Sequence, residues 1–389
     1  MEVKLEKFVP GGQALGVLPD GKKIFAWGGL PNETVEIGIT KSKKNFAEGI
    51  VTKIINANPH RIKPKDDCFV STSPWQIMDY NFELEQKAEL IKEAFGQEGI
   101  DNLADINIET DGNEYFYRNK MEYSLWWDND TEKISLAFHK RGTHRKAPID
   151  GSSIERPEIF AEATRIVDEL NANGDEARRY QALMLRANQN GEVSGGLLEN
   201  GKPHPKFKTL TDTILGHKYT YSPNGFFQIN IPVYEMALME IKKHIDADLP
   251  IVDMYSGVGT IGLSIAGAEQ SVALVETNKD AYMELEKNCH NVENAQPALS
   301  AAENALEYIK YDINLIVDPP RAGLDNALTE SILEKMPRKV IYLSCNPTTQ
   351  ARDIAKLLTK YNIAQIVGFN FFPRTPHIEN LIVLERKND

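Results

Sequence analysis

Cysteine is scarce in this sequence. The 389 residues include three cysteines, Cys68, Cys289 and Cys345, which lie far apart along the chain. An odd number of distant cysteines argues against a disulfide framework and against a dense cluster of metal ligands. The count still allows a single reactive thiol.

Long apolar runs are also absent. No segment approaches the roughly 18 apolar residues of a membrane span, and the charged start MEVKLEKFVPGG lacks the apolar core of a secretory signal. We therefore expect a cytoplasmic protein without a membrane partner. Hydrophobic residues make up 41% of the chain and charged residues 26%, which is typical of globular domains, and the length predicts about two or three of them.

Positive charge is in deficit overall but not at the front of the chain. The net charge is −12, yet residues 1–65 carry 11 lysines and arginines against 6 acidic residues. Three basic clusters could meet RNA phosphates: Lys41, Lys43 and Lys44; Arg61, Lys63 and Lys65; and Lys140, Arg141, Arg145 and Lys146. Any one of them is more simply explained as a solvated loop face, but three together favour an RNA partner.

The first half of the chain predicts two small units and a connection. Residues 1–58 contain short runs of alternating apolar and polar residues separated by Gly and Pro turns, a pattern that predicts a closed β-barrel. Residues 59–98 contain a basic, turn-rich linker and then the helical segment FELEQKAELIKEAFG, which Gly96 should end. Residues 99–215 mix short strands with the helix PEIFAEATRIVDEL, which predicts a central α+β domain.

Residues 216–389 follow a different rhythm. Strands such as PIVDMY, SVALVET, INLIVDPP and KVIYLSC alternate with helical segments, which indicates an α/β fold with a parallel, doubly wound sheet. AQIVGFNFFPRT and HIENLIVLER are strands with no helix between them. We expect them to form an antiparallel hairpin that closes the edge of the sheet.

A glycine-rich turn follows the first of these strands, in VDMYSGVGTIG. In a parallel sheet, ligands bind outside the carboxyl ends of the strands. Gly257, Gly259 and Gly262 fit the pattern G-x-G-x-x-G, and Glu276 lies 19 residues beyond Gly257. Asp253 and Glu276 end successive strands and could accept the hydroxyls of a ribose or cap helices. This evidence alone leaves open a nicotinamide oxidoreductase and a turn that binds no ligand.

Three further residues fall at the same edge of the predicted sheet. Asp318 ends a strand in VDPPR, and Cys345 directly follows the strand KVIYLS and precedes a helix, whose N-terminal charge should favour the thiolate. Glu379 begins the last strand and reaches this edge if the hairpin folds back. A rigid loop, a buried small hydrophobe and an exposed glutamate are the alternatives, but the strand-end position favours Cys345 as a nucleophile.

Several motifs resemble the RNA uracil-carbon-5 methyltransferase family and occur in that family's order: FFQIN, DMYSGVGTIG, VET, DPPRAGLD, SCNPTTQARD and PHIENLIVLER. The segments YRNKMEYS and FHKRGTHR resemble the family's central domain, and the N-terminal barrel resembles the OB-like TRAM RNA-binding module. The resemblance implies four units: a TRAM-like barrel (1–58), a degenerate iron-sulfur region (59–98), a central RNA-binding domain (99–215) and a Rossmann-like class I methyltransferase domain (216–389).

The resemblance also implies residue roles. Cys345 would add to carbon 6 of a uridine in ribosomal or transfer RNA, and Glu379 would remove the proton from carbon 5. The uridine would be flipped into the site, and the enzyme is expected to act as a monomer. The residues that would bind S-adenosylmethionine are Gln228, Tyr255, Gly257, Glu276 and Asp318.

The sequence departs from the family at two points. Many members hold a four-iron cluster with four cysteines, but the corresponding segment DDCFVSTSPWQIMDY retains Cys68 alone, so we predict no iron-sulfur cluster and no metal. Thr260 stands in the glycine loop where members often have Asn, which puts a side-chain contact to the cofactor in doubt.

Other activities stay open on the sequence. An amino methyltransferase would have an aromatic residue after Asp-Pro-Pro, where this chain has Arg321. Cytosine-carbon-5 methylation of RNA also uses cysteine addition and needs product analysis to exclude. A catalytically inactive RNA-binding or RNA-folding factor is the alternative outside the enzymes, and the presence of both Cys345 and Glu379 disfavours it.

Overall fold

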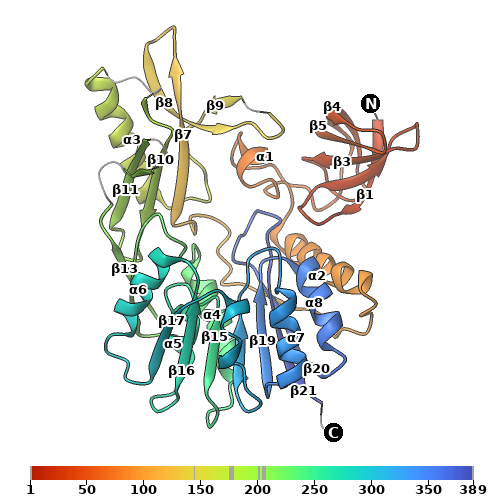
Figure 1. The fold of residues 1–389 in the computed structure, drawn as a ribbon. Helices are drawn as coiled ribbons and strands as arrows, with labels where there is room; N and C mark the ends of the chain where they lie inside the picture. Colours follow the sequence, from red (N-terminus) through yellow and green to blue (C-terminus); the bar gives the residue numbers. More distant parts are fainter. Residues whose placement is uncertain (1, 144, 175–178, 200–201, 204–206, 388–389) are drawn as a thin grey trace.

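The computed structural model describes residues 2–143, 145–174, 179–199, 202–203 and 207–387. A small barrel and a central sheet lie side by side above a large α/β sheet, and the helix α1 (Phe69–Thr72) lies between the barrel and the central sheet (Figure 1). Among the described residues, no helix has the length and apolar character needed to span a membrane.

Five strands close the N-terminal barrel in the order β1-β2-β3-β5-β4. In β1 the side chains of Val3, Leu5 and Phe8 are buried in the barrel, while most residues between them face outward. The predicted barrel is therefore confirmed. Its strands are β1 (Glu2–Phe8), β2 (Ala14–Val17), β3 (Lys23–Trp27), β4 (Thr34–Ser42) and β5 (Phe46–Asn56).

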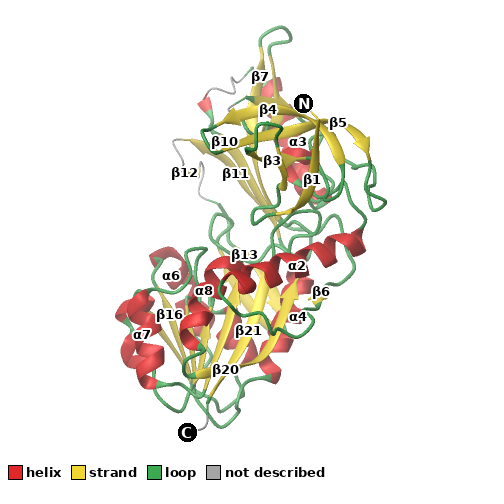
Figure 2. Ribbon diagram, turned by 90° about the vertical axis from the view of Figure 1, so that its right-hand side faces the viewer, coloured by secondary structure: helices red, strands yellow, loops and turns green. Residues whose placement is uncertain are grey.

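The segment after the barrel packs against the large sheet. Helix α2 (Tyr80–Gln97) is capped by the carboxylate of Asp79 and continues one residue past Gly96, where the sequence pattern predicted its stop. It lies against helix α8 (Pro347–Leu357) of the large sheet (Figure 2). Strand β6 (Ile108–Glu109) pairs in parallel with β20 at the edge of the same sheet.

Buried contacts cross two of the expected domain boundaries. The segment 59–98, expected to be a linker and a helix, packs on the large sheet through α2, and β6, inside the expected central domain, pairs with the edge of that sheet. The boundary between 215 and 216 falls in the turn of a hairpin, β13 (Leu210–Ile214) and β14 (His217–Tyr221), whose buried side chains share a core with the large sheet. Composition changed at these places, but buried apolar contacts decide which unit a segment joins.

The central sheet has six strands in the order β12-β11-β10-β7-β8-β9. Helix α3 (Pro157–Ala172) covers one face with Ile159, Ala163 and Val167, and it begins with Pro157 in the first turn as expected. The strands are β7 (Lys120–Asp128), β8 (Lys133–His139), β9 (Lys146–Pro148), β10 (Ala182–Ala187), β11 (Val193–Glu199) and β12 (Lys202–Pro203).

The large sheet has eight strands in the order β17-β16-β15-β18-β19-β21-β20-β6. The neighbouring strands β17, β16, β15, β18 and β19 are parallel, and β21 runs antiparallel to both β19 and β20. The predicted α/β fold with a terminal hairpin is therefore confirmed. Its sequential strands are β15 (Ile251–Met254), β16 (Val272–Glu276), β17 (Ala295–Leu299), β18 (Asn314–Val317), β19 (Lys339–Ser344), β20 (Tyr361–Phe369) and β21 (Glu379–Arg386).

Helices connect these strands and cover both faces of the sheet: α4 (Ile231–Lys243), α5 (Thr260–Ile265), α6 (Lys279–Cys289), α7 (Asn326–Lys335) and α8 (Pro347–Leu357), with short 3-10 turns at Ala302–Asn304 and Leu306–Tyr308 (Figure 1). The chain order reverses between β15 and β18, because β16 and β17 lie on one side and β18 and β19 on the other. In open α/β sheets, such a switch point is where the ligand crevice forms.

Candidate functional site

The hairpin brings Cys345 and Glu379 to the same edge of the large sheet. Ser344, the last residue of β19, pairs with Asn380 in β21, so Cys345 and Glu379 leave the ladder opposite each other. Cys345 is half-buried, and Glu379 is buried. The hairpin therefore folds back as expected, and it brings a thiol and a carboxyl group to adjacent positions at one edge of the sheet.

The electrostatic environment of Cys345 differs from the expectation. The pKa of its thiol is raised to about 11, mainly by burial; the carboxyl groups of Glu379 and Asp318 also raise it, and the guanidinium of Arg321 lowers it. The prediction that the N-terminus of α8 favours the thiolate is therefore wrong for this structure. The sequence placed the helix correctly but could not show that two acidic side chains surround the sulfur.

Asp318 and Glu379 lie in the same enclosed region. Burial raises the pKa of Asp318 to about 7, and burial together with the neighbouring Asp318 holds the pKa of Glu379 well above its ordinary range. Within the described part of the chain, no group donates a hydrogen bond to either carboxyl group. Both are therefore suited to accept protons or hydrogen bonds from a ligand.

The loop that follows Asp318 is tied to the helix that follows Cys345. Asn346 caps α8 with its side-chain oxygen, and its amide nitrogen donates to the carbonyl oxygen of Arg321 at 2.9 Å. The hydroxyl of Thr349 donates to the same carbonyl at 3.0 Å. The two prolines between Asp318 and Arg321 have no backbone N–H and a fixed φ angle, so the loop is held rigidly beside the sulfur.

Arg321 and His377 form the outer side of this region. Nη2 of Arg321 lies 3.1 Å from Nδ1 of His377, where the guanidinium donates to the neutral imidazole. Although part of the ring reaches solvent, desolvation by the surrounding loop and the positive charge of Arg321 lower the pKa of His377 to about 4.

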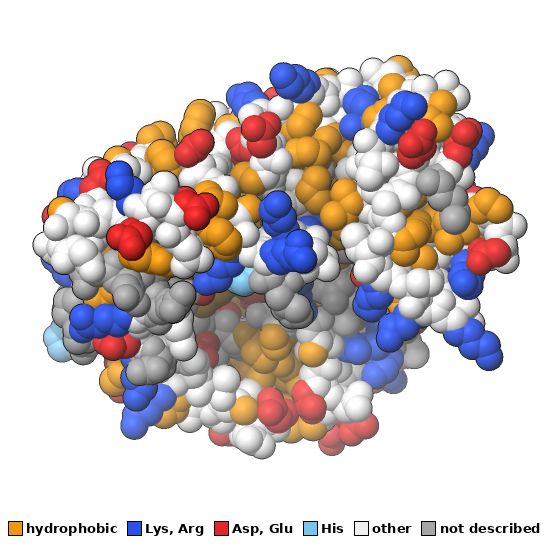
Figure 3. All heavy atoms as spheres, turned by 90° about the horizontal axis from the view of Figure 1, so that it is seen from above, with side chains coloured by type: hydrophobic (Ala, Val, Ile, Leu, Met, Phe, Trp, Pro, Cys, Tyr) orange, Lys and Arg blue, Asp and Glu red, His pale blue; other side chains and the backbone are white. Residues whose placement is uncertain are grey.

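Seen from above, lysine and arginine side chains line the hollow between the barrel and the central sheet (Figure 3). This positive region is suited to RNA phosphates.

The glycine turn lies on the other side of the switch point. Gly257 and Gly259 have φ angles of +58° and +92°, which glycine adopts at little cost. The amide of Gly257 donates to the carboxylate of Glu276 at 2.8 Å, and a Cβ atom at Gly257 would meet no atom within 4 Å. Tyr255 has a φ angle of +65°, an unfavourable backbone conformation for a bulky residue that is often found at functional sites. The turn thus presents backbone to open space beside an acidic side chain.

Two buried polar atoms beneath this turn have no partner among the described residues. They are Oδ1 of Asp253 and Oγ of Ser256. The other oxygen of Asp253 accepts the amide of Gly262 at 2.8 Å, and burial raises the pKa of Asp253 to about 8. Buried polar groups normally have hydrogen-bond partners. Together with the free acceptor sites of Glu276, these atoms fit a polar ligand such as S-adenosylmethionine.

Gln228 lies in the loop before α4, and Thr260 is the first residue of α5, directly after the glycine turn. Gln228 is half-buried, and its carbonyl oxygen accepts the side-chain amide of Asn119 at 3.0 Å. The hydroxyl of Thr260 is buried 2.7 Å from the hydroxyl of Tyr234. Thr260 thus uses its side chain to join α5 to α4, and we expect no cofactor contact from it.

Sequence reasoning missed the residues that hold the loop before Glu379. The buried carboxylate of Glu83 on α2 accepts the amide of Arg374 at 3.0 Å and the side-chain amide of Asn370 at 3.1 Å. The buried Lys87 donates to Asn370 at 2.6 Å and lies 3.0 Å from Glu83. Glu83 and Lys87 stand four residues apart in the helical pattern of α2, but the pattern did not show that both face inward.

The barrel also contacts this loop. The indole nitrogen of Trp75 donates to the carbonyl oxygen of Gly12 at 3.1 Å, and the backbone amide of Trp75 donates to the carbonyl oxygen of Arg374 at 3.1 Å. A Cβ atom at Gly12 would lie 2.2 Å from the ring of Pro376, so only glycine fits in this turn of the barrel. Pro376 is three residues from Glu379.

The residues around Cys68 do not fit an iron-sulfur cluster. Its sulfur lies 4.0 Å from the hydroxyl of Thr72 and 4.0 Å from the carbonyl oxygen of Gly151. The two other cysteines of the chain end α6 and follow β19. A four-iron cluster is held by about four thiolates, and this part of the chain offers one.

Comparisons with known proteins agree with this fold. Residues 211–387 match the family model described as tRNA (Uracil-5-)-methyltransferase, and residues 1–52 match the TRAM domain. An RNA methyltransferase of Gloeobacter violaceus, described as uncharacterised, is 27% identical over 446 residues and covers 99% of this chain and 96% of its own length. Another such protein, from Bacillus cereus, is 29% identical over 426 residues, covering 94% of this chain and 92% of the relative.

A solved structure has the same fold over the whole chain. The Pyrococcus abyssi tRNA (uracil-54, C5)-methyltransferase in complex with S-adenosyl-L-homocysteine superposes with a TM-score of 0.77 at 22% identity, covering 99% of this chain and 100% of that one. The doubly wound sheet with its glycine turn and acidic strand ends, behind a TRAM barrel, defines an S-adenosylmethionine-dependent RNA methyltransferase. Residues 211–387 are similar to the tRNA (uracil-5-)-methyltransferase family, whose model they match.

The raised thiol pKa predicts how Cys345 reacts with iodoacetamide. With a pKa of about 11, about one thiol in 10⁴ is ionised at pH 7, so the alkylation rate should rise about tenfold per pH unit and level off near pH 11. Because Glu379 raises this pKa, Glu379→Gln should increase the rate at pH 9. Mass spectrometry of the Cys345 peptide measures each rate separately from Cys68 and Cys289. A plateau already reached at pH 8 would contradict the prediction.

Proposed function

We propose that this enzyme methylates carbon 5 of a uridine in structured RNA through a covalent bond between Cys345 and the pyrimidine ring. The observation that supports it is the meeting of Cys345 and Glu379 at the end of β19 and the start of β21, across from the glycine turn. A nucleophile and a proton acceptor are the two groups that this reaction requires.

The order of the strands suggests how two ligands share the cleft. S-adenosylmethionine supplies an electrophilic methyl group on a sulfonium. Gly257 and Tyr255 after β15 and Glu276 at the end of β16 would hold it on one side, with Gln228 bordering it from the start of α4. Asp318 follows β18, between this side and Cys345 after β19. We propose that Asp318 contacts the cofactor and also lies within reach of the uracil ring.

In the first step, the thiol of Cys345 loses its proton to solvent and the sulfur bonds to carbon 6 of uracil. The electron pair of the 5,6 double bond moves into the ring as an enolate, which makes carbon 5 nucleophilic. Carbon 5 then takes the methyl group. Because the resting thiol is neutral, part of the barrier to reaction is the ionisation of Cys345.

In the second step, Glu379 removes the proton that remains on carbon 5. The electron pair of that C–H bond restores the 5,6 double bond, and the bond between carbon 6 and sulfur breaks to release the thiolate. Once ionised, Glu379 is a stronger base than an exposed carboxylate, because burial and the neighbouring Asp318 hold its pKa well above the ordinary range. Its place opposite Cys345 would put it next to the adduct.

The substrate we propose is an unpaired uridine of transfer or ribosomal RNA, because a base outside a duplex is the least costly to flip into a site. The TRAM barrel and the basic hollow between it and the central sheet would bind the surrounding RNA. We propose that the enzyme acts in the cytoplasm as a monomer.

The proposal is tested with tritiated methyl donor and total RNA from a strain that lacks the enzyme. We expect label in 5-methyluridine at one position, found by nucleoside analysis and mapping. Label in 5-methylcytidine would show that cytosine is the substrate, and no label in any RNA would favour an inactive RNA-binding factor.

Glu276→Gln tests the cofactor side of the site. The substitution removes the negative charge. It also places an NH₂ group against the backbone amides of Gly257 and Asn278, which donate hydrogen bonds to the carboxylate in the wild type. We expect the Kd for S-adenosylhomocysteine to rise about 10- to 100-fold, because hydrogen bonds to charged groups contribute about 1.5–3 kcal/mol. Calorimetric titration measures it, with the exposed Glu286→Gln on α6 as the control. Equal affinities of the two variants would remove Glu276 from the site.

A further inference from the structure

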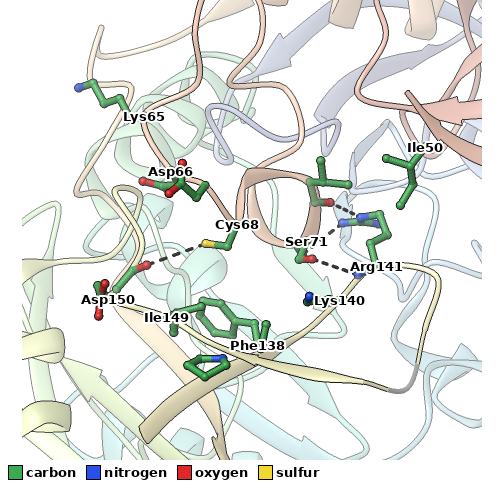
Figure 4. Close-up of a pocket in the computed structure, with 15 residues that line it drawn as sticks. Ile50, Lys65, Asp66, Cys68, Ser71, Phe138, Lys140, Arg141, Ile149 and Asp150 are labelled. Atoms are coloured by element: carbon green, nitrogen blue, oxygen red, sulfur yellow. Dashed lines mark hydrogen bonds between the residues drawn. The ribbon is translucent and has the colours of Figure 1, made fainter. Parts of the chain in front are cut away.

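A cavity of about 630 Å³ opens between the barrel, α1 and the loop that joins β8 to β9. It shares no lining residue with the edge that holds Cys345 and Glu379. Figure 4 shows that Cys68 points into it from α1, with Phe138 and Ile149 below. The volume lies within the range of about 300 to 1,000 Å³ that small ligands occupy.

One wall of the cavity is apolar and contains a fixed aromatic ring. Phe138 near the end of β8 stacks on Tyr123, with ring centroids 5.7 Å apart and planes 14° apart. Ile149 and Val70 complete the wall. An aromatic ring held by a neighbour is a platform on which any nucleobase can stack.

Basic side chains form the rim next to this wall. The guanidinium of Arg141 donates to the carbonyl oxygens of Val70 and Ser71 and lies 4.1 Å from the ring centroid of Trp27 in the barrel. Lys140 is exposed, and no residue in the described parts of the chain accepts a hydrogen bond from its ammonium group. The rim thus offers one anchored and one unengaged cation to a phosphate.

Acidic side chains on the opposite rim limit what can bind. Asp67 and Asp150 line the cavity and are exposed, whereas Asp66 is engaged by the amide of Ser153 at 3.0 Å. Carboxylates repel polyphosphates but accept N–H groups of bases. The lining therefore suits one base with one flanking phosphate better than a free nucleoside triphosphate.

The cavity lies near the catalytic edge. The positive charge of Arg141 is among those that lower the pKa of His377, which contacts Arg321 beside Cys345. A single RNA strand bound at the catalytic edge would therefore pass near Arg141. The methylation step itself gives no role to Lys140 and Arg141, whereas contact with this RNA strand would give them one.

We propose that this cavity binds an unpaired nucleotide of the RNA substrate, separate from the uridine that is methylated. The base stacks on Phe138, Asp67 and Asp150 accept its N–H groups, and Lys140 and Arg141 bind its phosphate. This inference rests on the proposed function, because it assumes that the chain methylates RNA.

The test uses a synthetic RNA with the mapped uridine, in which each other unpaired nucleotide is made abasic in turn. We expect one abasic position to raise KM five- to a hundredfold with kcat unchanged, as removal of one base–aromatic stack does. Phe138→Leu should raise KM to a similar extent on the intact RNA and add little on that abasic RNA. Trp126→Leu, an exposed aromatic on the neighbouring strand outside the cavity, is the matched control.

Lys140→Glu is a second cavity variant that should fold normally, because this side chain is exposed. It keeps the test valid if Phe138→Leu fails to fold. We expect it to raise KM about tenfold, while Lys133→Glu, at the other end of β8, leaves KM unchanged. Two results would show that the inference alone is wrong while the wild-type enzyme still methylates the RNA. In the first, KM stays the same in both cavity variants and at every abasic position. In the second, the KM increases caused by Phe138→Leu and by base removal multiply when the two changes are combined. If the wild-type enzyme methylates no RNA, both the inference and the proposed function are wrong.

Discussion

Cys345→Ala is expected to lower the rate of methyl transfer to RNA by at least about 10⁴-fold, the scale of loss when a nucleophile is removed. Without the sulfur, carbon 5 of uracil is too weak a nucleophile to take the methyl group. The affinity for S-adenosylhomocysteine should be unchanged, since the glycine turn and Glu276 lie on the other side of the switch point. Single-turnover transfer of labelled methyl groups and calorimetric titration measure the two quantities.

Cys289→Ala is the matched control for this variant. Cys289 ends α6 and is buried in the core of the large sheet, so its replacement should leave the rate of methyl transfer nearly unchanged. A Cys345→Ala enzyme that still methylates uridine at a tenth of the normal rate would show that no covalent adduct is needed.

Glu379→Gln is expected to stop the reaction after one methyl transfer. The amide cannot take the proton from carbon 5, so the methylated ring should stay bonded to Cys345, and steady-state turnover should fall about 10²- to 10⁴-fold, the usual contribution of a general base. Methyl transfer itself should continue to about one methyl group per enzyme. Quench-flow kinetics measure this burst, and denaturing gel electrophoresis measures a protein–RNA complex that survives detergent.

Glu385→Gln, on the same strand but exposed, supplies the comparison. It should turn over like the wild type and accumulate no stable complex. A Glu379→Gln enzyme with neither a burst nor a trapped complex would assign Glu379 to an earlier step, and normal turnover would exclude it from catalysis.

Much of the architecture was predictable because one physical pattern repeats along the chain. The alternation of apolar residues in β1 and the strand–helix rhythm after β14 both follow from which side chains must be buried. Strand β17 was not predicted, since its sequence AQPAL contains Pro297, which only an edge strand tolerates, and β17 does pair on one side alone. Strand β6, with two residues, is too short to have a pattern.

The site was predictable in position but not in electrostatics. Strand ends could be located from apolar runs, so Asp318, Cys345 and Glu379 could be assigned to one edge before the fold was known. The pKa of the thiol depends on which groups surround the sulfur after folding, and for the same reason the inward-facing Glu83 and Lys87 on α2 could not be recognised. Contacts between segments almost 300 residues apart leave no local signature.

The close fit of Gly12 against Pro376 links binding and rate in this protein. The first turn of the barrel touches the segment that leads into the proton acceptor, so any tilt of the barrel would be transmitted to that carboxyl group within three residues. Mutations in the N-terminal barrel can therefore alter kcat even when every contact between the protein and the RNA is kept. RNA affinity and turnover then cannot be assigned to separate parts of the polypeptide.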